Sequence, residues 1–394
     1  MIKRLLPVFL LTIAVWLLAV RPAQAASAPQ PVKDQGVLCL PGVYSQTPGD
    51  CQPLGPSTYL SKLAQAGLTF PATPFSINHP DRSLTYVNVN YGQVNKNNAP
   101  IYGSVEDALK GKKDNAIGRI EASFSYISYT DEVLIDGKRF YMIEPGAWMT
   151  ANDIIRIGSV PLFQGLTFKQ TPRTTFGWVL SYLSPGPVAT KRTPGFQNQD
   201  YTSHTLNNHE VVQVYGVENV GGEDWYMVGP DEWVHQNMLA RVIPNTKPPE
   251  GVTSDRWIEV NLFEQTIAVY DQNQLVFATL IASGLEPFWT RPGLFQIYEK
   301  LETTPMRGAF EADRSDAYYL EDVPWTMYFD QARALHGAYW RANLGFPQSH
   351  GCVNLSVGDS RWIFDWAEVG DFVYVWDPSG ETPVDSGQYT AGGA

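Results

Sequence analysis

The stretch of sequence that decides the fold is residues 257–280, WIEVNLFEQTIAVYDQNQLVFATL. Its apolar residues fall into three short runs, at 257–262, 266–270 and 275–280, and the polar turn 271–274 separates the last two. Short runs rich in Val, Ile, Leu and aromatic residues, bounded by Asp, Asn and Gln, are typical of β-strands. We therefore expect antiparallel strands to open a new domain here, in a protein that is mainly β.

The composition on either side sets the boundaries of this domain. Residues 245–255 are rich in Pro and polar residues, which is typical of a linker. Ser356, with an acidic residue three positions later, predicts the start of one packed helix, and a last strand follows it. Residues 379–394 are rich in Ser, Gly, Thr and Asp, and we expect them to form a disordered tail. The domain is thus expected to span residues 256–378.

Upstream of the linker, the chain repeats itself at a spacing of 85 residues. The segment 140–148, FYMIEPGAW, recurs as 225–233, WYMVGPDEW. A repeat of this length indicates two copies of one structural module, which we place at 85–159 and 170–244. Each copy reads as short strands separated by turns, such as Asp136-Gly137 in a hairpin, so we expect two small barrels.

The pattern YM…P…W shared by the two copies resembles the bacterial SH3-like repeats of cell-wall enzymes. This resemblance implies that the modules attach the protein to the wall. The alternative is that Trp148 and Trp233 are simply core residues, since a fold does not fix a function.

The first 25 residues have the pattern of an export signal. Lys3 and Arg4 precede the apolar run 5–20, and Ala23-Gln24-Ala25 supplies the small residues of a cleavage site. We therefore expect a signal peptide at 1–25 and a location in the cell envelope. A retained membrane anchor is the alternative, because the run is only slightly shorter than a spanning helix.

Charge and cysteine usage narrow the class of protein further. The formal net charge of −12 argues against a nucleic-acid partner, because binding to phosphates needs Lys and Arg. An oxidising compartment favours a disulfide between Cys39 and Cys51 in the N-terminal segment 26–84. Cys352 is then left without a partner, either as an inert buried thiol or as a reactive one.

Cys352 lies in the motif SHGCVN at 349–354, and His336 lies upstream of it. A thiol becomes an effective nucleophile when a neighbouring base or cation favours the thiolate. His336 and His350 are the available partners. The alternatives are a core cluster, or a zinc site in which Cys352 and the two histidines are ligands, with Asp359 as a further candidate.

These motifs resemble those of the L,D-transpeptidases of bacterial cell walls, whose signature is a histidine followed at a fixed distance by Ser/Thr-His-Gly-Cys-x-Asn or Arg. The similarity extends over about residues 256–378, through TRPGLFQIYEK, VPWTMYF, LHGAYW and SHGCVNL. It implies a β-sandwich-like catalytic domain with one packed helix. It also implies that Cys352 is the nucleophile, that His336 is the general base, and that His350 lies beside the thiolate.

The same resemblance implies supporting roles for neighbouring residues. The carbonyl of Gly337 would orient His336, Gly351 and Cys352 would supply N–H groups to an oxyanion, and Ser349 would be a hydrogen-bonding strut. Asn354 is similar to a residue that positions the substrate peptide. Six aromatic residues are candidates for a peptide groove, although we expect more of them in the core: Tyr318, Tyr319, Trp325, Tyr328, Tyr339 and Trp340.

The reaction implied by the resemblance is acyl transfer between peptidoglycan stem peptides, without a metal or a cofactor. Residues 251–378 contain 18 acidic and 8 basic residues, so an acidic cleft that attracts an amine acceptor is one expectation and a solvated acidic surface is the other. Two other functions remain open. The thioester could pass to water, which would make the protein an L,D-carboxypeptidase, or the domain could bind wall peptide without turnover.

Overall fold

The computed structural model describes residues 75–121, 124–182, 186–197, 199–309, 317–385 and 389. The predicted signal peptide, the predicted Cys39–Cys51 disulfide and the end of the predicted tail lie outside the described residues. The described part of the chain is mainly β, as predicted, and its α-helices are α2 (Val105–Lys110) and α3 (Val357–Trp366). In this part of the chain, no helix is both long and apolar enough to cross a membrane.

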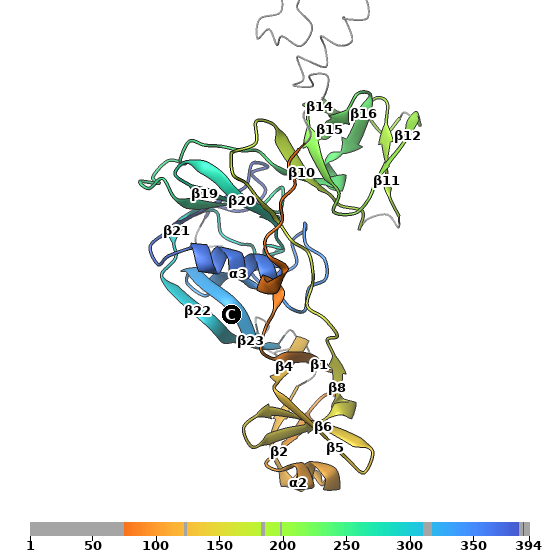
Figure 1. Cartoon of the computed structure of the whole chain (residues 1–394), viewed down its shortest axis with the longest axis vertical. Coiled ribbons are helices and arrows are strands. Elements are labelled where there is room, and N and C mark those ends of the chain that lie inside the picture. Colours follow the sequence, from red (N-terminus) through yellow and green to blue (C-terminus); the bar gives the residue numbers. More distant parts are fainter. Residues whose placement is uncertain are drawn as a thin grey trace, which may run out of the picture.

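The C-terminal domain contains two sheets that pack face to face (Figure 1). The first sheet has the order β21-β26-β18-β19-β20-β9. Its strands are β9 (Leu166–Thr167), β18 (Trp257–Asn261), β19 (Thr266–Asp271), β20 (Gln274–Leu280), β21 (Gly293–Gln296) and β26 (Phe372–Trp376). In the second sheet, the strands of this domain follow the order β25-β24-β23, and β22 also pairs with β23. Its strands are β22 (Glu299–Gly308), β23 (Tyr318–Asp330), β24 (Arg333–Gly337) and β25 (Val353–Leu355).

The predicted strands at the start of this domain are present as β18, β19 and β20. β19 pairs antiparallel with both neighbours, and Asp271 faces Gln274 at the end of the ladder with β20. The turn between them places Gln272 and Asn273 at φ 51° and 58°. Two successive residues with positive φ are typical of the tight hairpin turn whose twist matches that of the strands.

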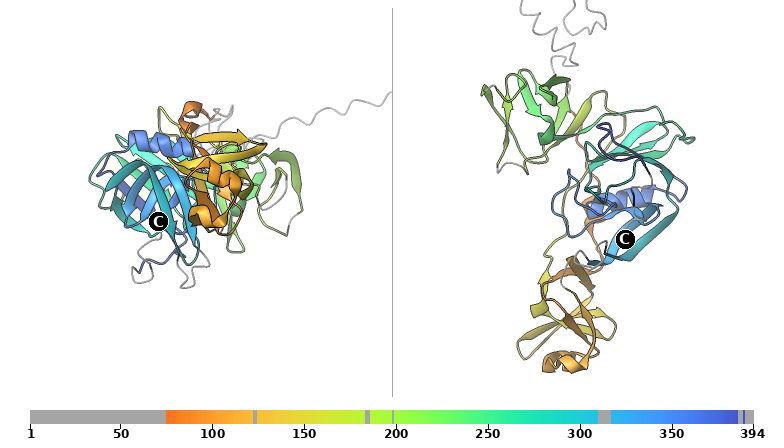
Figure 2. Two further views of the ribbon diagram at one scale, coloured as in Figure 1. Left: turned by 90° about the horizontal axis from the view of Figure 1, so that it is seen from below. Right: turned by 180° about the vertical axis from the view of Figure 1, so that it is seen from behind.

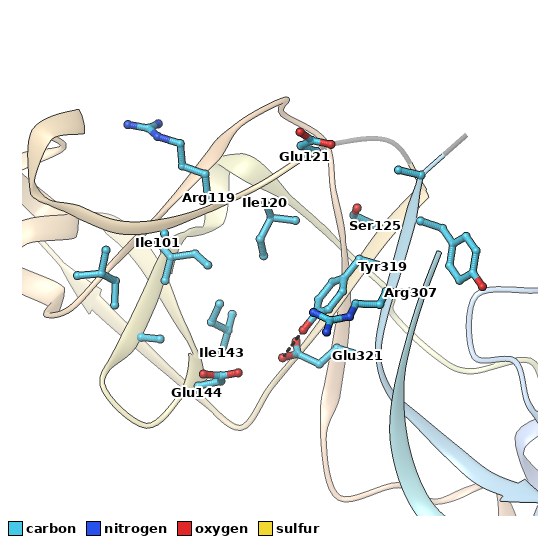
Figure 3. Close-up of a pocket in the computed structure, with 15 residues that line it drawn as sticks. Ile101, Arg119, Ile120, Glu121, Ser125, Ile143, Glu144, Arg307, Tyr319 and Glu321 are labelled. Atoms are coloured by element: carbon cyan, nitrogen blue, oxygen red, sulfur yellow. Dashed lines mark hydrogen bonds between the residues drawn. The ribbon is translucent and has the colours of Figure 1, made fainter. Parts of the chain in front are cut away.

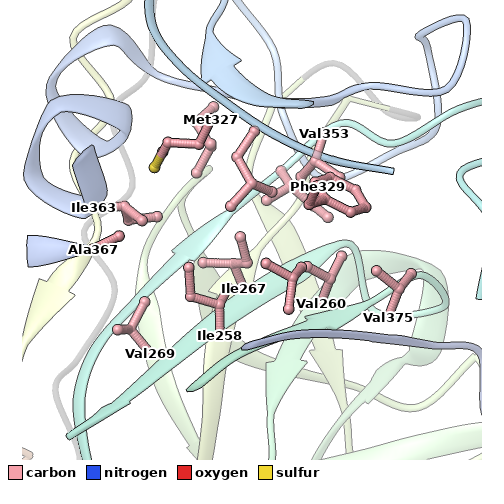
Figure 4. Close-up of a cluster of buried hydrophobic side chains, with 14 of the residues drawn as sticks. Ile258, Val260, Ile267, Val269, Met327, Phe329, Val353, Ile363, Ala367 and Val375 are labelled. Atoms are coloured by element: carbon pink, nitrogen blue, oxygen red, sulfur yellow. The ribbon is translucent and has the colours of Figure 1, made fainter. Parts of the chain in front are cut away.

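The core of the sandwich lies between the two sheets and is capped by α3 (Figure 4). Ile258 and Val260 of the first sheet face Met327 and Phe329 of the second, and Ile363 of α3 covers one end. The side chains of Ile258, Val260, Met327 and Ile363 are fully buried. Each such side chain contributes roughly 1.5–3 kcal/mol to folding, so this core holds the two sheets together.

Helix α3 begins at the predicted position. The Oγ of Ser356 accepts a hydrogen bond from the backbone N–H of Asp359 at 3.2 Å, which satisfies a free donor of the first turn. The buried carboxylate of Asp359 accepts hydrogen bonds from the N–H of Gly165 and the Oγ1 of Thr279. Burial raises the pKa of Asp359 to about 6. The helix is therefore tied to β20 and to the chain just before β9.

The two predicted modules have the same strand order, and we name them repeat 1 (residues 85–159) and repeat 2 (170–244). Repeat 1 has the orders β4-β1-β8 and β3-β2-β7-β6-β5, and repeat 2 has β13-β10-β17 and β12-β11-β16-β15-β14. The strands of repeat 1 are β1 (Asn90–Val94), β2 (Ala99–Tyr102), β3 (Ala116–Ile120), β4 (Phe124–Tyr129), β5 (Asp131–Ile135), β6 (Lys138–Glu144), β7 (Ala147–Thr150) and β8 (Ile154–Arg156). Those of repeat 2 are β10 (Thr175–Val179), β11 (Val188–Lys191), β12 (Tyr201–Leu206), β13 (Val211–Val214), β14 (Gly216–Val220), β15 (Glu223–Gly229), β16 (Glu232–His235) and β17 (Leu239–Val242).

The spacing of 85 residues is kept in the structure, for example between β1 and β10 and between β6 and β15. The predicted hairpin turn is also present, with Asp136 and Gly137 at φ 49° and 73° between β5 and β6. Trp148 is partly buried against Tyr102 and Phe140, and Trp233 packs against Met227. Both tryptophans therefore contribute to the cores of their modules.

The two repeats lie at opposite ends of the C-terminal domain (Figures 1 and 2). Repeat 1 continues the second sheet, because β4 pairs with β23 in parallel. Repeat 2 contacts the first sheet through Arg241 on β17. The guanidinium of Arg241 forms a buried ion pair with Glu264 at 2.6 Å, and its carbonyl accepts a hydrogen bond from the Oγ1 of Thr266.

Gly177 on β10 tests how closely β10 and β17 must approach each other within repeat 2. A Cβ at this position would lie 2.2 Å from the carbonyl oxygen of Ala240 on the paired strand, so the backbones must move apart to accept it. We expect Gly177→Ala to destabilise the protein by about 1–3 kcal/mol. Urea unfolding followed by tryptophan fluorescence measures the change.

Gly158→Ala is the matched control, because its added Cβ has no neighbour within 4 Å. We expect this variant to stay within about 0.5 kcal/mol of the parent. Equal shifts for the two variants would show that the close approach of β10 and β17 does not require glycine.

Candidate active site

The parallel pairing of β24 with β25 brings the predicted catalytic residues together. His336 on β24 faces Asn354 on β25, and Cys352 directly precedes β25. They surround one narrow pocket of about 30 Å³. The pocket is lined by Phe124, Met306, Tyr318, Leu320, His336, Trp340, Arg341, Ser349, His350, Cys352 and Asn354.

The thiol of Cys352 is buried and protonated at rest. Cys352 is 6% exposed, and its Sγ lies 3.6 Å from the carbonyl oxygen of Ala332. Burial raises the pKa of this thiol to about 11, and the nearby Arg333 lowers it only in part. A neutral thiol therefore predominates near neutral pH.

The imidazole of His336 is neutral as well, and the hydrogen bonds around it place its proton. Burial lowers the pKa of His336 to about 4. Arg341, which can only donate, gives a hydrogen bond from Nε to the Oδ1 of Asn354 at 2.6 Å, so the Nδ2 of Asn354 faces His336. That amide donates to Nε2 of His336 at 3.2 Å. Nε2 is thus the acceptor nitrogen, and Nδ1 carries the proton toward the carbonyl of Gly337 at 3.3 Å.

Ser349 and Gly351 hold the loop that carries the thiol. The Oγ of Ser349 donates to the carbonyl of Cys352 at 2.5 Å and accepts from the N–H of Gly351 at 3.1 Å. Gly351 adopts φ 118°, a backbone conformation that favours glycine. Because its N–H is already bonded to Ser349 at rest, Gly351 can donate to an oxyanion only after this hydrogen bond breaks.

His350 and Tyr318 form one side of the pocket. Their rings are stacked with centroids 5.4 Å apart and an interplanar angle of 9°. Phe288 contacts the same imidazole at 4.8 Å. His350 is therefore held by ring contacts in the wall of the thiol pocket, next to the strand β23 that carries Tyr318.

Repeat 1 contributes to the pocket, which the sequence analysis did not anticipate. Phe124 of β4 lines the pocket, and its ring lies 6.4 Å from that of Trp340. Tyr91 of β1 stacks on Tyr339 with centroids 3.5 Å apart. The module expected only as a tether therefore supplies one wall of the site.

Hydrogen bonds fix this junction between repeat 1 and β23. Ser128 donates from its backbone N–H to the Glu321 carboxylate at 2.7 Å and from its Oγ to Asp322 at 2.6 Å. The hydroxyl of Tyr91 donates to the carbonyl of Asp322 at 2.9 Å. Burial, with the nearby carboxylates of Asp322 and Glu144, raises the pKa of Glu321 to about 7.

A second cavity, of about 390 Å³, lies between repeat 1 and the strands β22 and β23 (Figure 3). Ile120 and Ile143 of repeat 1 face Tyr319 and Glu321 of β23 across it. Glu144 lines the same cavity. The lining of this cavity holds three carboxylates, of Glu121, Glu144 and Glu321, together with Arg119 and Arg307. The described lining of the thiol pocket contains no carboxylate. The expectation of an acidic cleft at the thiol is not met in the described lining.

The aromatic candidates divide between pocket and core. Tyr318 and Trp340 line the thiol pocket, and Tyr319 lines the second cavity. Tyr339 is 1% exposed within the core. The others pack against neighbours: Trp325 against Phe364 and Tyr328 against Tyr298.

The zinc alternative has no support in the geometry of the described residues. These residues contain no group of three or more His, Cys, Asp and Glu side chains that could hold a metal ion. Asp359, the further ligand considered, instead binds Gly165 and Thr279.

The C-terminal domain is similar to a known family of proteins. Residues 255–375 match the YkuD family, which is the L,D-transpeptidase catalytic domain. We refer to this matched region as the YkuD domain. L,D-transpeptidase 1 of Mycobacterium tuberculosis is 30% identical over 171 residues, which cover 37% of this chain and 66% of that protein, just under two thirds of its length. A putative L,D-transpeptidase of Bacillus subtilis is 24% identical over 143 residues, covering 30% of this chain and 68% of that protein.

Solved structures of L,D-transpeptidases are also similar to this chain. The catalytic domain of an E. faecium L,D-transpeptidase acylated by ertapenem is 27% identical, with a TM-score of 0.29, and covers 32% of this chain and 100% of that one. An L,D-transpeptidase from Mycobacterium smegmatis is 15% identical, with a TM-score of 0.30, and covers 55% of this chain and 93% of that one.

The raised pKa of Cys352 predicts how the reactivity of this thiol depends on pH. Because its pKa is raised to about 11, the thiolate fraction should rise about tenfold for each pH unit across the neutral range. We expect the rate of alkylation of Cys352 by iodoacetamide to follow this slope between about pH 6 and pH 9. Peptide mass mapping at each pH measures modification at Cys352 alone. A plateau beginning near pH 6 would instead indicate a resting thiolate–imidazolium pair.

Tyr91 tests whether repeat 1 closes the pocket. Tyr91→Ala removes the ring stacked on Tyr339, which should lower the free energy of unfolding by about 3–5 kcal/mol. Because the thiol then becomes more exposed, alkylation of Cys352 at pH 8 should become faster. Tyr91→Phe keeps the ring and removes only the hydroxyl bonded to Asp322. This variant should lower the free energy of unfolding by about 1 kcal/mol and leave the alkylation rate near the parent value. An unchanged rate for Tyr91→Ala would separate repeat 1 from the site.

Proposed function

We propose that this protein is an exported peptidoglycan L,D-transpeptidase that acts through a thioester on Cys352. The observation that carries the proposal is the placement of Cys352 and a neutral His336 around one pocket of a YkuD domain. The proposed donor is a tetrapeptide stem that ends in D-alanine. The proposed acceptor is the side-chain amine of the third residue of another stem.

In the first step, Sγ of Cys352 attacks the carbonyl carbon between the third and fourth residues of the donor. The thiol proton passes to Nε2 of His336, the nitrogen that lacks a proton at rest. The carbon–sulfur bond forms, the carbon–nitrogen bond breaks, and His336 returns the proton to the amine of the departing D-alanine. Backbone N–H groups beside Cys352 stabilise the oxyanion in this step.

In the second step, the acceptor amine attacks the thioester carbon and the carbon–sulfur bond breaks. The amine proton passes through His336 back to Sγ, which restores the neutral pair. A thioester divides one difficult aminolysis into two easier steps, which is the general advantage of a covalent intermediate. At rest, the amide of Asn354 holds the ring of His336, and this hydrogen bond must break before Nε2 takes the thiol proton.

Hydrolysis is the second candidate function. The described lining of the pocket contains no carboxylate that would hold a cationic amine. Water competes for the same thioester, and the product would then be a tripeptide stem, as in an L,D-carboxypeptidase. Binding without turnover is less compatible with a thiol and an acceptor imidazole in one pocket.

Location and attachment complete the proposal. The pattern of residues 1–25 supports export to the cell envelope. We assign the predicted wall attachment to repeat 2, because β4 of repeat 1 is occupied by its pairing with β23. The peptide substrates then lie close to a tethered enzyme, which raises their effective concentration.

The chemistry is tested by mass spectrometry of muropeptides after incubation of the full chain with tetrapeptide stems. We expect free D-alanine and dimers joined through two third-position residues. Cys352→Ala should lower both by a factor on the order of 1,000 or more, because the nucleophile is lost. His336→Ala should lower acylation about 100-fold or more.

Circular dichroism of Cys352→Ala is the control, because a native spectrum shows that the loss of turnover does not come from a loss of structure. Ertapenem, which acylates the E. faecium relative, should add its mass to the parent and not to Cys352→Ala. Tripeptide as the sole product at every acceptor concentration would assign hydrolysis in place of transfer.

A further inference from the structure

Arg341 is a partly buried cation in the wall of the thiol pocket, and its hydrogen-bond partners are neutral. Three of its five N–H groups donate to oxygen atoms of Asn354 and Gln348. Nε contacts the Oδ1 of Asn354 at 2.6 Å, Nη1 contacts the Oε1 of Gln348 at 2.9 Å, and Nη2 contacts the carbonyl of Gln348 at 2.6 Å. Burial lowers the pKa of Arg341 to about 10, so the group remains charged at neutral pH.

The other arginines in the interior or on the helix of the YkuD domain differ from Arg341. Arg256, Arg291, Arg333 and Arg361 each form an ion pair with a carboxylate of this chain. No such pair includes Arg341 in the described chain. A buried charge without a counter-charge is costly, so a protein that keeps one commonly uses it to bind an opposite charge.

The pocket around Arg341 is suited to an anion that reaches the thiol. Cys352, His336 and Arg341 line the same narrow space, and its described lining contains no carboxylate. The indole Nε1 of Trp340, on the same wall, is buried without a hydrogen-bond acceptor. Among the described residues, three N–H groups of Arg341 have an acceptor, which leaves two free to donate to a ligand.

We propose that Arg341 binds the C-terminal carboxylate of the donor peptide and so makes the enzyme select stems that end one residue after the bond it breaks. This inference rests on the proposed function. In a tetrapeptide donor, the terminal carboxylate is separated from the attacked carbonyl carbon only by the N and Cα of D-alanine. A cation in the same pocket as the nucleophile is where such a carboxylate must lie. A longer stem would place a neutral peptide group beside Arg341, and the cation would remain uncompensated.

A purely structural role is the competing explanation, because Arg341 also joins Asn354 to Gln348. Loss of that role would disturb His336 and would slow the enzyme on every substrate by the same factor. A carboxylate-binding role makes a different prediction, since it affects only ligands that carry the terminal charge. The two are separated by a pair of ligands that differ in this group alone.

The test measures binding of two tetrapeptides to the full chain, one with a free C-terminal carboxylate and one with a C-terminal carboxamide. Cys352→Ala serves as the background, so that no turnover occurs, and calorimetry gives the dissociation constants. We expect the acid to bind roughly 10- to 100-fold more tightly than the amide, the usual range for hydrogen bonds to a charged group. Adding Arg341→Met should remove this preference and leave binding of the amide unchanged within about threefold. Arg341→Lys should restore part of the preference, because it restores the charge.

The control is Arg361→Met in the same background, since Arg361 lies on α3 outside the pocket and should leave the preference intact. Equal binding of acid and amide by the background protein would overturn the proposal, as would an equal loss for both ligands in Arg341→Met. This outcome is distinct from failure of the proposed function. If Cys352→Ala prefers the acid but the parent protein releases no D-alanine, Arg341 remains the carboxylate site and the proposed transferase activity is wrong.

Discussion

The parallel ladder between β4 and β23 is the contact on which the geometry of the site depends. In this ladder, Tyr318 pairs with Phe124 and Leu320 pairs with Tyr126, so a module far upstream in the sequence is joined to the strand beside the thiol. Alternate residues of a strand point to opposite faces. Leu320 therefore lines the thiol pocket and Tyr319 and Glu321 line the second cavity, whereas the large ring of Tyr318 borders both spaces. A shift of repeat 1 would change both spaces together.

Burial gives the site its resting electrostatic state. Desolvation acts on both groups in the direction of neutrality, raising the pKa of Cys352 to about 11 and lowering that of His336 to about 4. The resting thiol is therefore a weaker nucleophile than a thiolate would be. Since the resting pair carries no charge, the nearby positive charge of Arg341 is not neutralised by a thiolate. It remains available to an anionic group of the ligand.

The sequence predicted those features whose signals are local. The strands of 257–280, the cap at Ser356 and the repeat of 85 residues are patterns that a short window contains, and the motifs at 336 and 349–354 are joined by adjacent strands. The β4–β23 ladder leaves no such pattern, because its two strands are separated by most of repeat 1, repeat 2 and the linker. Arg341 was missed because its importance lies in the neutrality of its partners. Likewise, the acidic excess of the domain did not indicate where the carboxylates gather. The signal peptide, the disulfide, the tail and the wall attachment stay predictions.

The two repeats show how one module can serve two purposes. The three-stranded sheets β4-β1-β8 and β13-β10-β17 are equivalent, yet they meet the YkuD domain through opposite edges. Repeat 1 uses β4, whose edge is covered by β23, whereas repeat 2 uses β17, which carries the buried Arg241–Glu264 ion pair. Within the described strands, β13 therefore has β10 as its sole partner and leaves one edge unpaired. An unpaired edge can accept an extended chain, whereas a paired edge cannot. One copy of the module thus forms part of the thiol pocket, whereas the other keeps a strand edge that is unpaired among the described strands.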